Sequence, residues 1–265
     1  MSIEEKLPHL NSMTKYPSIP TFHEIGDKGR LNDVFLDVPD GDLVYTEKVD
    51  GTNARIVISP DDVTLIGSRE DFLHALGDVV FNPAQHIVET IRDQAKDATE
   101  YFSGTHNLVV LFGEVYGTSI GKAAKNYTRS GDRGFRLFDA IEMPRTEMFE
   151  IMKMDRSAIS TWRETQRMQP FVDEDRLQAI ASELGWDLTP RLSMPSELSK
   201  VPDSVHDGLQ WLRVMINQTH CNLDGNADMT PEGIVVRAKD RSFIAKIRYE
   251  DYERTARARK KAQTA

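Results

Sequence analysis

Short runs of β-branched and aromatic residues, separated by turn-forming residues, recur along the chain in a pattern typical of strands. Two such runs, residues 44–49 and 56–58, lie on either side of Asp50-Gly51. An Asp-Gly pair favours a tight turn because glycine accepts a positive φ that residues with a Cβ resist. We therefore predict a hairpin of two strands, with Lys48 near the strand end beside the turn.

Other segments give equally clear patterns. Further strands are predicted at 63–67, 107–112, 134–141, 234–237 and 242–248, of which the last two form a second hairpin. Apolar residues at helical spacing predict helices over 83–101, with Asn82 as N-cap, over 173–184 and over 205–216. The first 42 residues are rich in Pro, Gly and Asp, and we expect a lead-in strand and loops packed on the main domain.

Composition places the chain among ordinary globular proteins. Its 265 residues are 39% hydrophobic and 28% charged, enough for one large domain with a sizeable core. The single cysteine, Cys221, excludes an internal disulfide, and the N-terminus lacks the features of a secretory signal. No apolar run reaches membrane-spanning length, so we expect a cytoplasmic protein without membrane contact.

The net charge of −9 argues against a protein that coats nucleic acid through bulk positive charge. An enzyme acting on nucleic acid needs only a local cationic track, and cations gather near the C-terminus: Lys246, Arg248, Arg254, Arg257, Arg259, Lys260 and Lys261. The same residues suit a solvated helix end, so both interpretations stay open. The histidines show no metal-ligand spacing, which disfavours a zinc site.

Three features suggest chemistry. Lys48 beside a turn would attack an electrophile if it were deprotonated, although an exposed hairpin lysine gives the same pattern. Glu114 follows a buried strand, where a carboxylate needs a cation, a metal or a hydroxyl, or else faces solvent. Period-two alternation puts Lys246 and Arg248 on one face, where they repel each other unless an anion such as a triphosphate lies between them.

Several compact motifs follow one another in a fixed order. They are Glu47-Lys48-Val49-Asp50-Gly51-Thr52-Asn53, Gly67-Ser68-Arg69, Gly113-Glu114-Val115-Tyr116-Gly117, Phe135-Arg136-Leu137-Phe138-Asp139, Glu232-Gly233-Ile234-Val235-Val236-Arg237 and Ala245-Lys246-Ile247-Arg248. This set resembles that of the covalent nucleotidyltransferases, which comprise ATP-dependent DNA ligases, RNA ligases and mRNA capping enzymes. The first and third motifs most resemble RNA ligases of the RNA ligase 2 type.

The resemblance implies an α+β nucleotidyltransferase fold, ATP-grasp-like, with antiparallel sheets flanked by helices. The chain would divide into a lead-in at 1–42, an adenylyltransferase domain at 43–250 and a basic tail at 251–265. Seventeen residues follow Arg248, so we expect no full C-terminal domain, and strand binding would rest on the main domain, the tail or a protein partner.

The resemblance also implies a reaction. Lys48 would attack the α-phosphorus of ATP to form lysyl-AMP, AMP would pass to an RNA 5′-phosphate, and a 3′-hydroxyl would displace it. Lys48, Lys246 and Arg248 would be catalytic, and Glu114 and Glu232 would bind Mg²⁺ (or Mn²⁺). Phe138 would stack on adenine. The implied nucleotide-binding residues are Glu47, Lys48, Val49, Asn53, Arg55, Arg69, Glu114, Phe138, Glu232, Lys246 and Arg248.

Two residues depart from the RNA ligase 2 pattern. Asp50 replaces a usual histidine, as in DNA ligases, capping enzymes and other RNA ligases, and Arg248 replaces a usual lysine, which keeps the charge but changes the geometry. A minimal DNA ligase and a non-catalytic binding module of the same fold stay open as alternatives. The strand substrate and the oligomeric state are not predicted.

Overall fold

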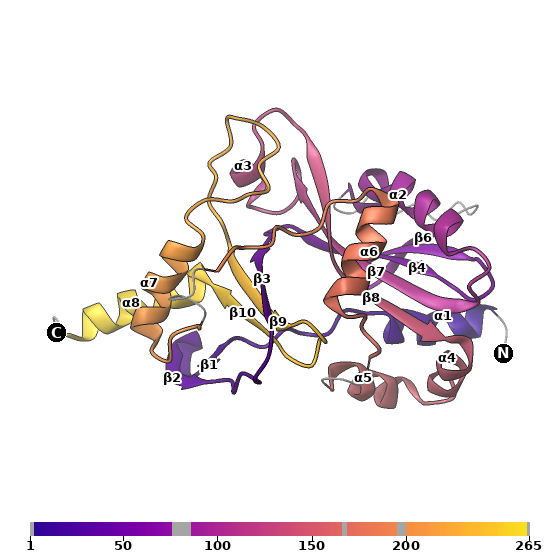
Figure 1. Cartoon of the computed structure of the whole chain (residues 1–265), viewed down its shortest axis with the longest axis horizontal. Helices are drawn as coiled ribbons and strands as arrows, with labels where there is room; N and C mark the ends of the chain where they lie inside the picture. The colour runs from indigo at the N-terminus through magenta and orange to yellow at the C-terminus, as the bar shows by residue number, and fades with distance from the viewer. Residues whose placement is uncertain (1–2, 76–85, 166–168, 195–199, 264–265) are drawn as a thin grey trace.

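The computed structural model describes residues 3–75, 86–165, 169–194 and 200–263. Its described part holds two main antiparallel sheets and a small two-stranded one, with helices packed around them (Figure 1). The larger sheet, with helices packed on both of its faces, forms one lobe, and the three-stranded sheet with α7 (Val205–Met215) and α8 (Tyr249–Gln263) forms the other.

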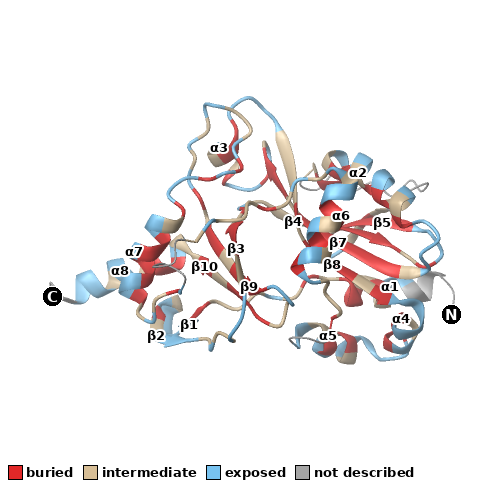
Figure 2. Ribbon diagram, in the orientation of Figure 1, coloured by how far each residue is buried: buried red, intermediate tan, exposed pale blue. Residues whose placement is uncertain are grey.

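The larger sheet has the strand order β6-β5-β4-β7-β8, antiparallel throughout. Its strands are β4 (Thr52–Ile58), β5 (Thr64–Ser68), β6 (Phe72–Ala75), β7 (Asn107–Gly117) and β8 (Arg133–Pro144). Both faces are covered, which explains the continuous apolar run of β7. One face packs against α2 (Ile87–Phe102) and α6 (Glu174–Leu184), and the other against α1 (Ile3–Met13), α4 (Arg145–Ile151) and α5 (Arg156–Glu164). The buried residues therefore concentrate on these strands (Figure 2).

The smaller sheet has the order β10-β9-β3. Its strands are β3 (Leu43–Lys48), β9 (Gly233–Ala238) and β10 (Ile244–Arg248). One face buries apolar side chains such as Tyr45, Val236 and Ile247 against α7 and α8. The two-stranded ribbon of β1 (His23–Ile25) and β2 (Leu31–Phe35), with the 3₁₀ turn Asp27–Gly29 between them, packs on α7 and α8. The other face of the smaller sheet is left to form a pocket.

The predicted hairpin around Asp50-Gly51 is wrong. The strands on either side of it belong to different sheets, since β3 pairs with β9 whereas β4 pairs with β5 and β7. Gly51 does not have a positive φ; a Cβ there would lie 2.2 Å from the carbonyl oxygen of Val115. Glycine is required at this point because the chain passes close to β7 as it crosses between the sheets.

A small cluster braces this crossing. Val49 packs with Tyr116, Tyr127 and Cys221, which come from β7, α3 (Ala124–Tyr127) and the segment between α7 and β9. The Tyr127 hydroxyl accepts a hydrogen bond from the Asp50 backbone N–H at 2.6 Å. α3 and the segment between α7 and β9 lie at the top of Figure 1.

The ends of the chain differ from the expectation. The lead-in contains helix α1, with Pro8 inside it, as well as strands and loops. The supposed tail is part of helix α8 as far as Gln263, and Arg254 donates to the carbonyl of Gly29. The predicted second hairpin and the helices at 173–184 and 205–216 are confirmed within one or two residues. Asn82 and Pro83 lie outside the described residues. Within the described ranges, no helix is both long and apolar enough to cross a bilayer.

Candidate functional site

A pocket of about 400 Å³ lies between the two main sheets. Alternate side chains along each strand of the smaller sheet line this pocket, because every second residue of a strand lies on the same face. They are Thr46 and Lys48 from β3, Val235 and Arg237 from β9, and Ile244, Lys246 and Arg248 from β10. The opposite wall comes from the larger sheet and includes Asn53, Glu114 and Phe138. The structure thus gathers most of the sequence-predicted site residues in one place.

Lys48 forms an ion pair in this pocket. Its Nζ donates to Glu232 Oε2 at 2.6 Å, and both side chains are largely buried. Burial raises the pKa of the Glu232 carboxyl, and the charge of Lys48 partly opposes that rise. Glu232 stands just before β9, and its own carbonyl accepts a hydrogen bond from the Tyr249 backbone N–H at 3.0 Å. The amine is therefore held at a fixed point of the pocket wall.

Two further cations lie on the same sheet face. Burial lowers the pKa of Lys246, and the nearby charges of Arg248 and Lys48 lower it further. Arg248 is held by α8, because its Nε and Nη2 donate to the two carboxylate oxygens of Asp251. Arg69, on the rim, donates from Nη2 to Ser18 Oγ at 3.0 Å. The pocket therefore offers several positive groups to a polyanion.

Glu114 faces these cations from the larger sheet. Its Oε1 accepts a hydrogen bond from the Gly51 N–H at 3.2 Å. Burial raises the pKa of its carboxyl to about 8, with Glu232 and Asp50 adding to the rise and Lys48 opposing it. A cation bound beside this buried carboxyl would stabilise its ionised form.

The residues present fit a magnesium ion that takes further ligands from a bound phosphate. Magnesium is usually held by one or two carboxylates together with substrate phosphates and water. Glu114 and Glu232 supply two such carboxylates, close enough for their charges to interact. In the part of the chain that the structure describes, no group of three or more His, Cys, Asp or Glu side chains forms a metal cage.

Phe138, Asn53 and Val49 also line the pocket. The Phe138 ring meets Tyr16 edge to face at 5.0 Å between ring centroids and keeps part of its surface open. The Oδ1 of Asn53 is buried and accepts no hydrogen bond within the described ranges. An aromatic face and a free acceptor beside a polyanion site suit a nucleotide.

Two predicted residues are not presented to the pocket in the expected way. The side chain of Glu47 points to the other face of β3, where its carboxylate accepts from the Thr219 hydroxyl and from the His220 N–H. Arg55 does not line the pocket at all. It is fully buried, stacks over the Phe72 ring at 4.9 Å and donates to Asn11.

Sequence reasoning missed one wall of the pocket. Tyr16, Pro17 and Ile19 precede the whole motif series, yet all three line the cavity. The segment reaches it because the backbone of Lys246 donates to the carbonyl of Pro20 and accepts from the N–H of Phe22. No local sequence pattern predicts that this segment pairs with the edge of β10.

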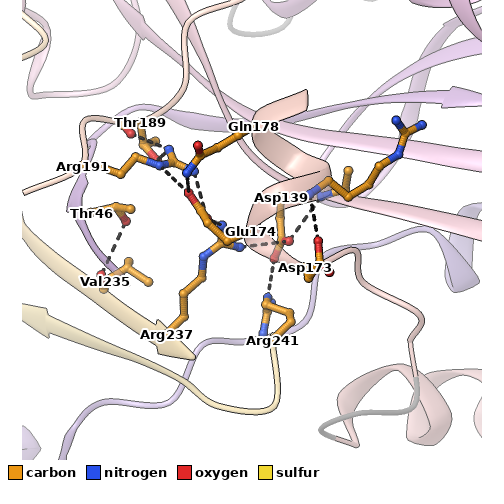
Figure 3. A network of polar contacts seen from close by, with 12 residues as sticks. Thr46, Asp139, Asp173, Glu174, Gln178, Thr189, Arg191, Val235, Arg237 and Arg241 are labelled. Carbon is orange, nitrogen blue, oxygen red and sulfur yellow. Dashed lines mark hydrogen bonds and ion pairs between the residues drawn. The ribbon is translucent and has the colours of Figure 1, made fainter. Parts of the chain in front are cut away.

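A buried polar network underlies the pocket and joins the two sheets (Figure 3). Arg237 of β9 bonds to Asp139 of β8 and to Glu174 at the start of α6. Glu174 also accepts from Arg191 Nε at 2.9 Å, and Asp139 from Arg241 Nε at 2.7 Å. Asp139 and Arg237 stand in the quoted motifs, but the sequence assigned them no partner.

Comparisons with known proteins agree with this geometry. A model of the RNA ligase family matches residues 41–248, and a search of curated proteins finds no match. The fold resembles solved structures of an RNA ligase from Naegleria gruberi. A mutant with ATP and Mn is 16% identical with a TM-score of 0.52, covering 79% of this chain and 50% of that one. A second mutant with ATP and Mn is 17% identical with a TM-score of 0.52, covering 92% and 62%.

A mutant of the same ligase with AMP and Mn is 16% identical with a TM-score of 0.51, covering 89% of this chain and 62% of that one. The present chain thus spans about half to three fifths of those proteins. The likeness confirms the predicted α+β fold of the nucleotidyltransferases, with antiparallel sheets and flanking helices. Because the family match extends over most of the sequence, we conclude that the chain belongs to the RNA ligase family.

Proposed function

We propose that the protein is an ATP-dependent RNA ligase that works through a lysyl-AMP intermediate. The observation that carries the proposal is the position of Lys48. Its amine lies in a pocket between two sheets, paired with Glu232, on the same sheet face as Lys246 and Arg248. A nucleophile, cations and carboxylates thus share one cavity of a size suited to a nucleotide.

In the first step the Lys48 nitrogen forms a bond to the α-phosphorus of ATP, and the bond from that phosphorus to the bridging oxygen breaks. Pyrophosphate leaves, and the nitrogen loses a proton to water. The charge of Lys246 repels that of the Lys48 side chain, whereas Glu232 pairs with Lys48. A magnesium or manganese ion held by Glu114 and Glu232 would offset their charge and add neutralisation on the phosphates.

The remaining residues bind and orient. Lys246 and Arg248 neutralise the charge that develops on pyrophosphate as it departs. Phe138, on the larger sheet, provides a face for adenine. An oxygen of the RNA 5′-phosphate then attacks the phosphorus of lysyl-AMP, and the bond from that phosphorus to the Lys48 nitrogen breaks. In the last step a 3′-hydroxyl attacks the phosphorus of the RNA 5′-phosphate and AMP leaves, which seals the strand.

The experiment uses ATP labelled at the α-phosphate, with magnesium or manganese, followed by denaturing electrophoresis. We expect label on the wild-type protein and none on Lys48→Ala. Label on Lys48→Ala, or none on the folded wild type, would overturn the proposal. Guanylyl transfer from GTP in the same assay would indicate a capping-type enzyme instead.

Nicked RNA and DNA duplexes of matched sequence then test which kind of strand the enzyme seals. We expect sealing of a 5′-phosphate end to a 3′-hydroxyl in nicked RNA, and weaker sealing of nicked DNA. Preference for the DNA duplex would indicate a minimal DNA ligase. A single-stranded RNA substrate, run alongside, shows whether a template is needed.

A further inference from the structure

The last strand of the pocket continues directly into a helix, and this junction places a carboxylate behind one of the pocket cations. Arg248 ends β10, Tyr249 begins α8, and Asp251 stands in the first turn of that helix. The Nε of Arg248 donates to Asp251 Oδ2 at 2.8 Å, and its Nη2 donates to Oδ1 at 3.0 Å. This is a bidentate pair, which fixes the plane of the guanidinium as well as its position.

The carboxylate is itself held firmly. The Asp251 side chain is only 1% exposed, and Oδ1 also accepts from Arg254 Nη2 at 2.5 Å. Arg254 in turn donates from Nε to the carbonyl of Gly29 at 2.9 Å. The helix start is anchored as well, because the Tyr249 hydroxyl donates to carbonyls at the end of α7. Asp251 therefore cannot follow Arg248 into the pocket, and Arg248 is oriented by it.

The pair leaves one edge of the guanidinium for another anion. Arg248 lines the pocket with 28% of its side chain exposed, and within the described ranges Nη1 has no hydrogen bond. A lysine at this position has a single nitrogen and could not bind Asp251 by two parallel bonds while offering a separate donor to a phosphate. The Asp251 carboxylate thus gives a physical reason for the arginine that replaces the usual lysine.

We propose that Asp251 is a positioning residue that holds Arg248 in the orientation needed to bind the pyrophosphate end of ATP. The inference rests on the proposed function. Asp251 need not touch the nucleotide; it acts through the guanidinium. Its effect should therefore appear in the binding of ATP and pyrophosphate and should depend on the presence of an arginine at position 248.

The test compares Asp251→Asn, Arg248→Lys and the double variant. Lysyl-AMP formation is measured against ATP concentration, and its reversal against pyrophosphate concentration. We expect Asp251→Asn to raise the half-saturating concentration of both ligands by about tenfold, as for a charge-assisted hydrogen bond whose geometry is lost. In the Arg248→Lys background, adding Asp251→Asn should change these values less than twofold, because the bidentate pair with Arg248 is already absent.

A matched control separates positioning from folding. Glu250→Gln removes an exposed carboxylate of the same helical turn and should leave the half-saturating concentrations unchanged. Arg254→Gln removes a contact that holds Asp251, so it should shift these concentrations in the same direction as Asp251→Asn but less, and it should lower the melting temperature. If Asp251→Asn does not fold, Asp251→Glu is used in its place. We expect it to raise the same half-saturating concentrations, but by a smaller factor.

Unchanged half-saturation in a folded Asp251 variant, or effects that multiply in the double variant, would overturn the inference. Equilibrium binding of ATP to Lys48→Ala, with and without Asp251→Asn, provides a measurement free of chemistry. If the wild type forms no lysyl-AMP, the proposed function fails. If the wild type reacts and Asp251→Asn behaves like it, only the role of Asp251 fails.

Discussion

Lys48 and Arg248 are register partners of the same residue, Gly233, on opposite sides of the central strand β9. Their backbones are thus about 10 Å apart, twice the spacing of neighbouring strands. Gly233 has a φ of 157°, and a Cβ there would lie 2.0 Å from the carbonyl oxygen of Ile247. Lys48 and Arg248 are therefore spaced by a residue that cannot carry a side chain.

The first prediction concerns this glycine. We expect Gly233→Ala to push β9 and β10 apart, to lower the free energy of unfolding by about 2 kcal/mol or more, and to abolish lysyl-AMP formation. Denaturant unfolding and the labelling assay measure the two effects. Gly225→Ala is the matched control, because nothing lies within 4 Å of its Cβ position. Equal effects of the two substitutions would contradict the prediction.

The second prediction concerns the network beneath the pocket. Arg237 is 3% exposed and bonds to Asp139 and Glu174, which come from different elements. Arg237→Met would leave two buried carboxylates short of their partner, so we expect a loss of about 3–5 kcal/mol in urea unfolding. Arg145→Met, which breaks the exposed pair with Asp61, should cost no more than about 1 kcal/mol. A smaller loss for Arg237→Met than for Arg145→Met would show that the network does not join the sheets.

The third prediction concerns pH. Burial raises the pKa of Glu114 from its ordinary value of 4.5 to about 8, so the folded protein binds this proton more tightly than the unfolded chain does. The resulting stabilisation is complete below about pH 4.5 and is lost as the pH rises toward about 8. Melting temperatures of the wild type should therefore fall, relative to Glu114→Gln, between pH 5 and pH 8.5.

Magnesium gives the complementary readout for Glu114. At pH 8.5, magnesium should raise the melting temperature of the wild type more than that of Glu114→Gln, because the ion binds the ionised carboxylate. Parallel pH curves for the two proteins, or an equal response to magnesium, would argue that Glu114 is not the titrating ligand.

The fourth prediction concerns Glu47, whose carboxylate accepts hydrogen bonds from Thr219 and His220 instead of pointing toward Lys48. We expect Glu47→Gln to change the half-saturating ATP concentration less than twofold while lowering the melting temperature. Phe138→Ala, in contrast, should raise the half-saturating ATP concentration about tenfold, because it removes the aromatic face. A large ATP effect from Glu47→Gln would restore the role that the sequence suggested.

The sequence predicted what depends on local pattern. Alternation along β10 placed Lys246 and Arg248 on one face, and apolar spacing over 173–184 predicted α6, which Asp173 and Gly185 cap in the structure. Asp50-Gly51 misled because the pair is equally suited to a hairpin and to a crossing between sheets. Only the distant strand β7, which approaches Gly51 closely, decides between the two.

The remaining differences have the same origin in long-range contacts. Arg55 follows the motif lysine closely in the sequence, but it lies on β4 in the other sheet, where its side chain packs against Asn11 and Phe72. Tyr16 reaches the pocket through a hydrogen bond to Asp139, which is 123 residues away in the sequence. Neither arrangement leaves a trace in neighbouring residues, so neither could be predicted from periodicity or spacing.

The wall formed by Tyr16, Pro17 and Ile19 precedes residue 41, where the match to the family begins. A compound that occupies the proposed adenine position beside Phe138 and extends toward this wall would contact side chains that lie outside the family match. Selective inhibitors of this protein should therefore be sought by growing ligands in that direction, away from Lys48, Lys246 and Arg248.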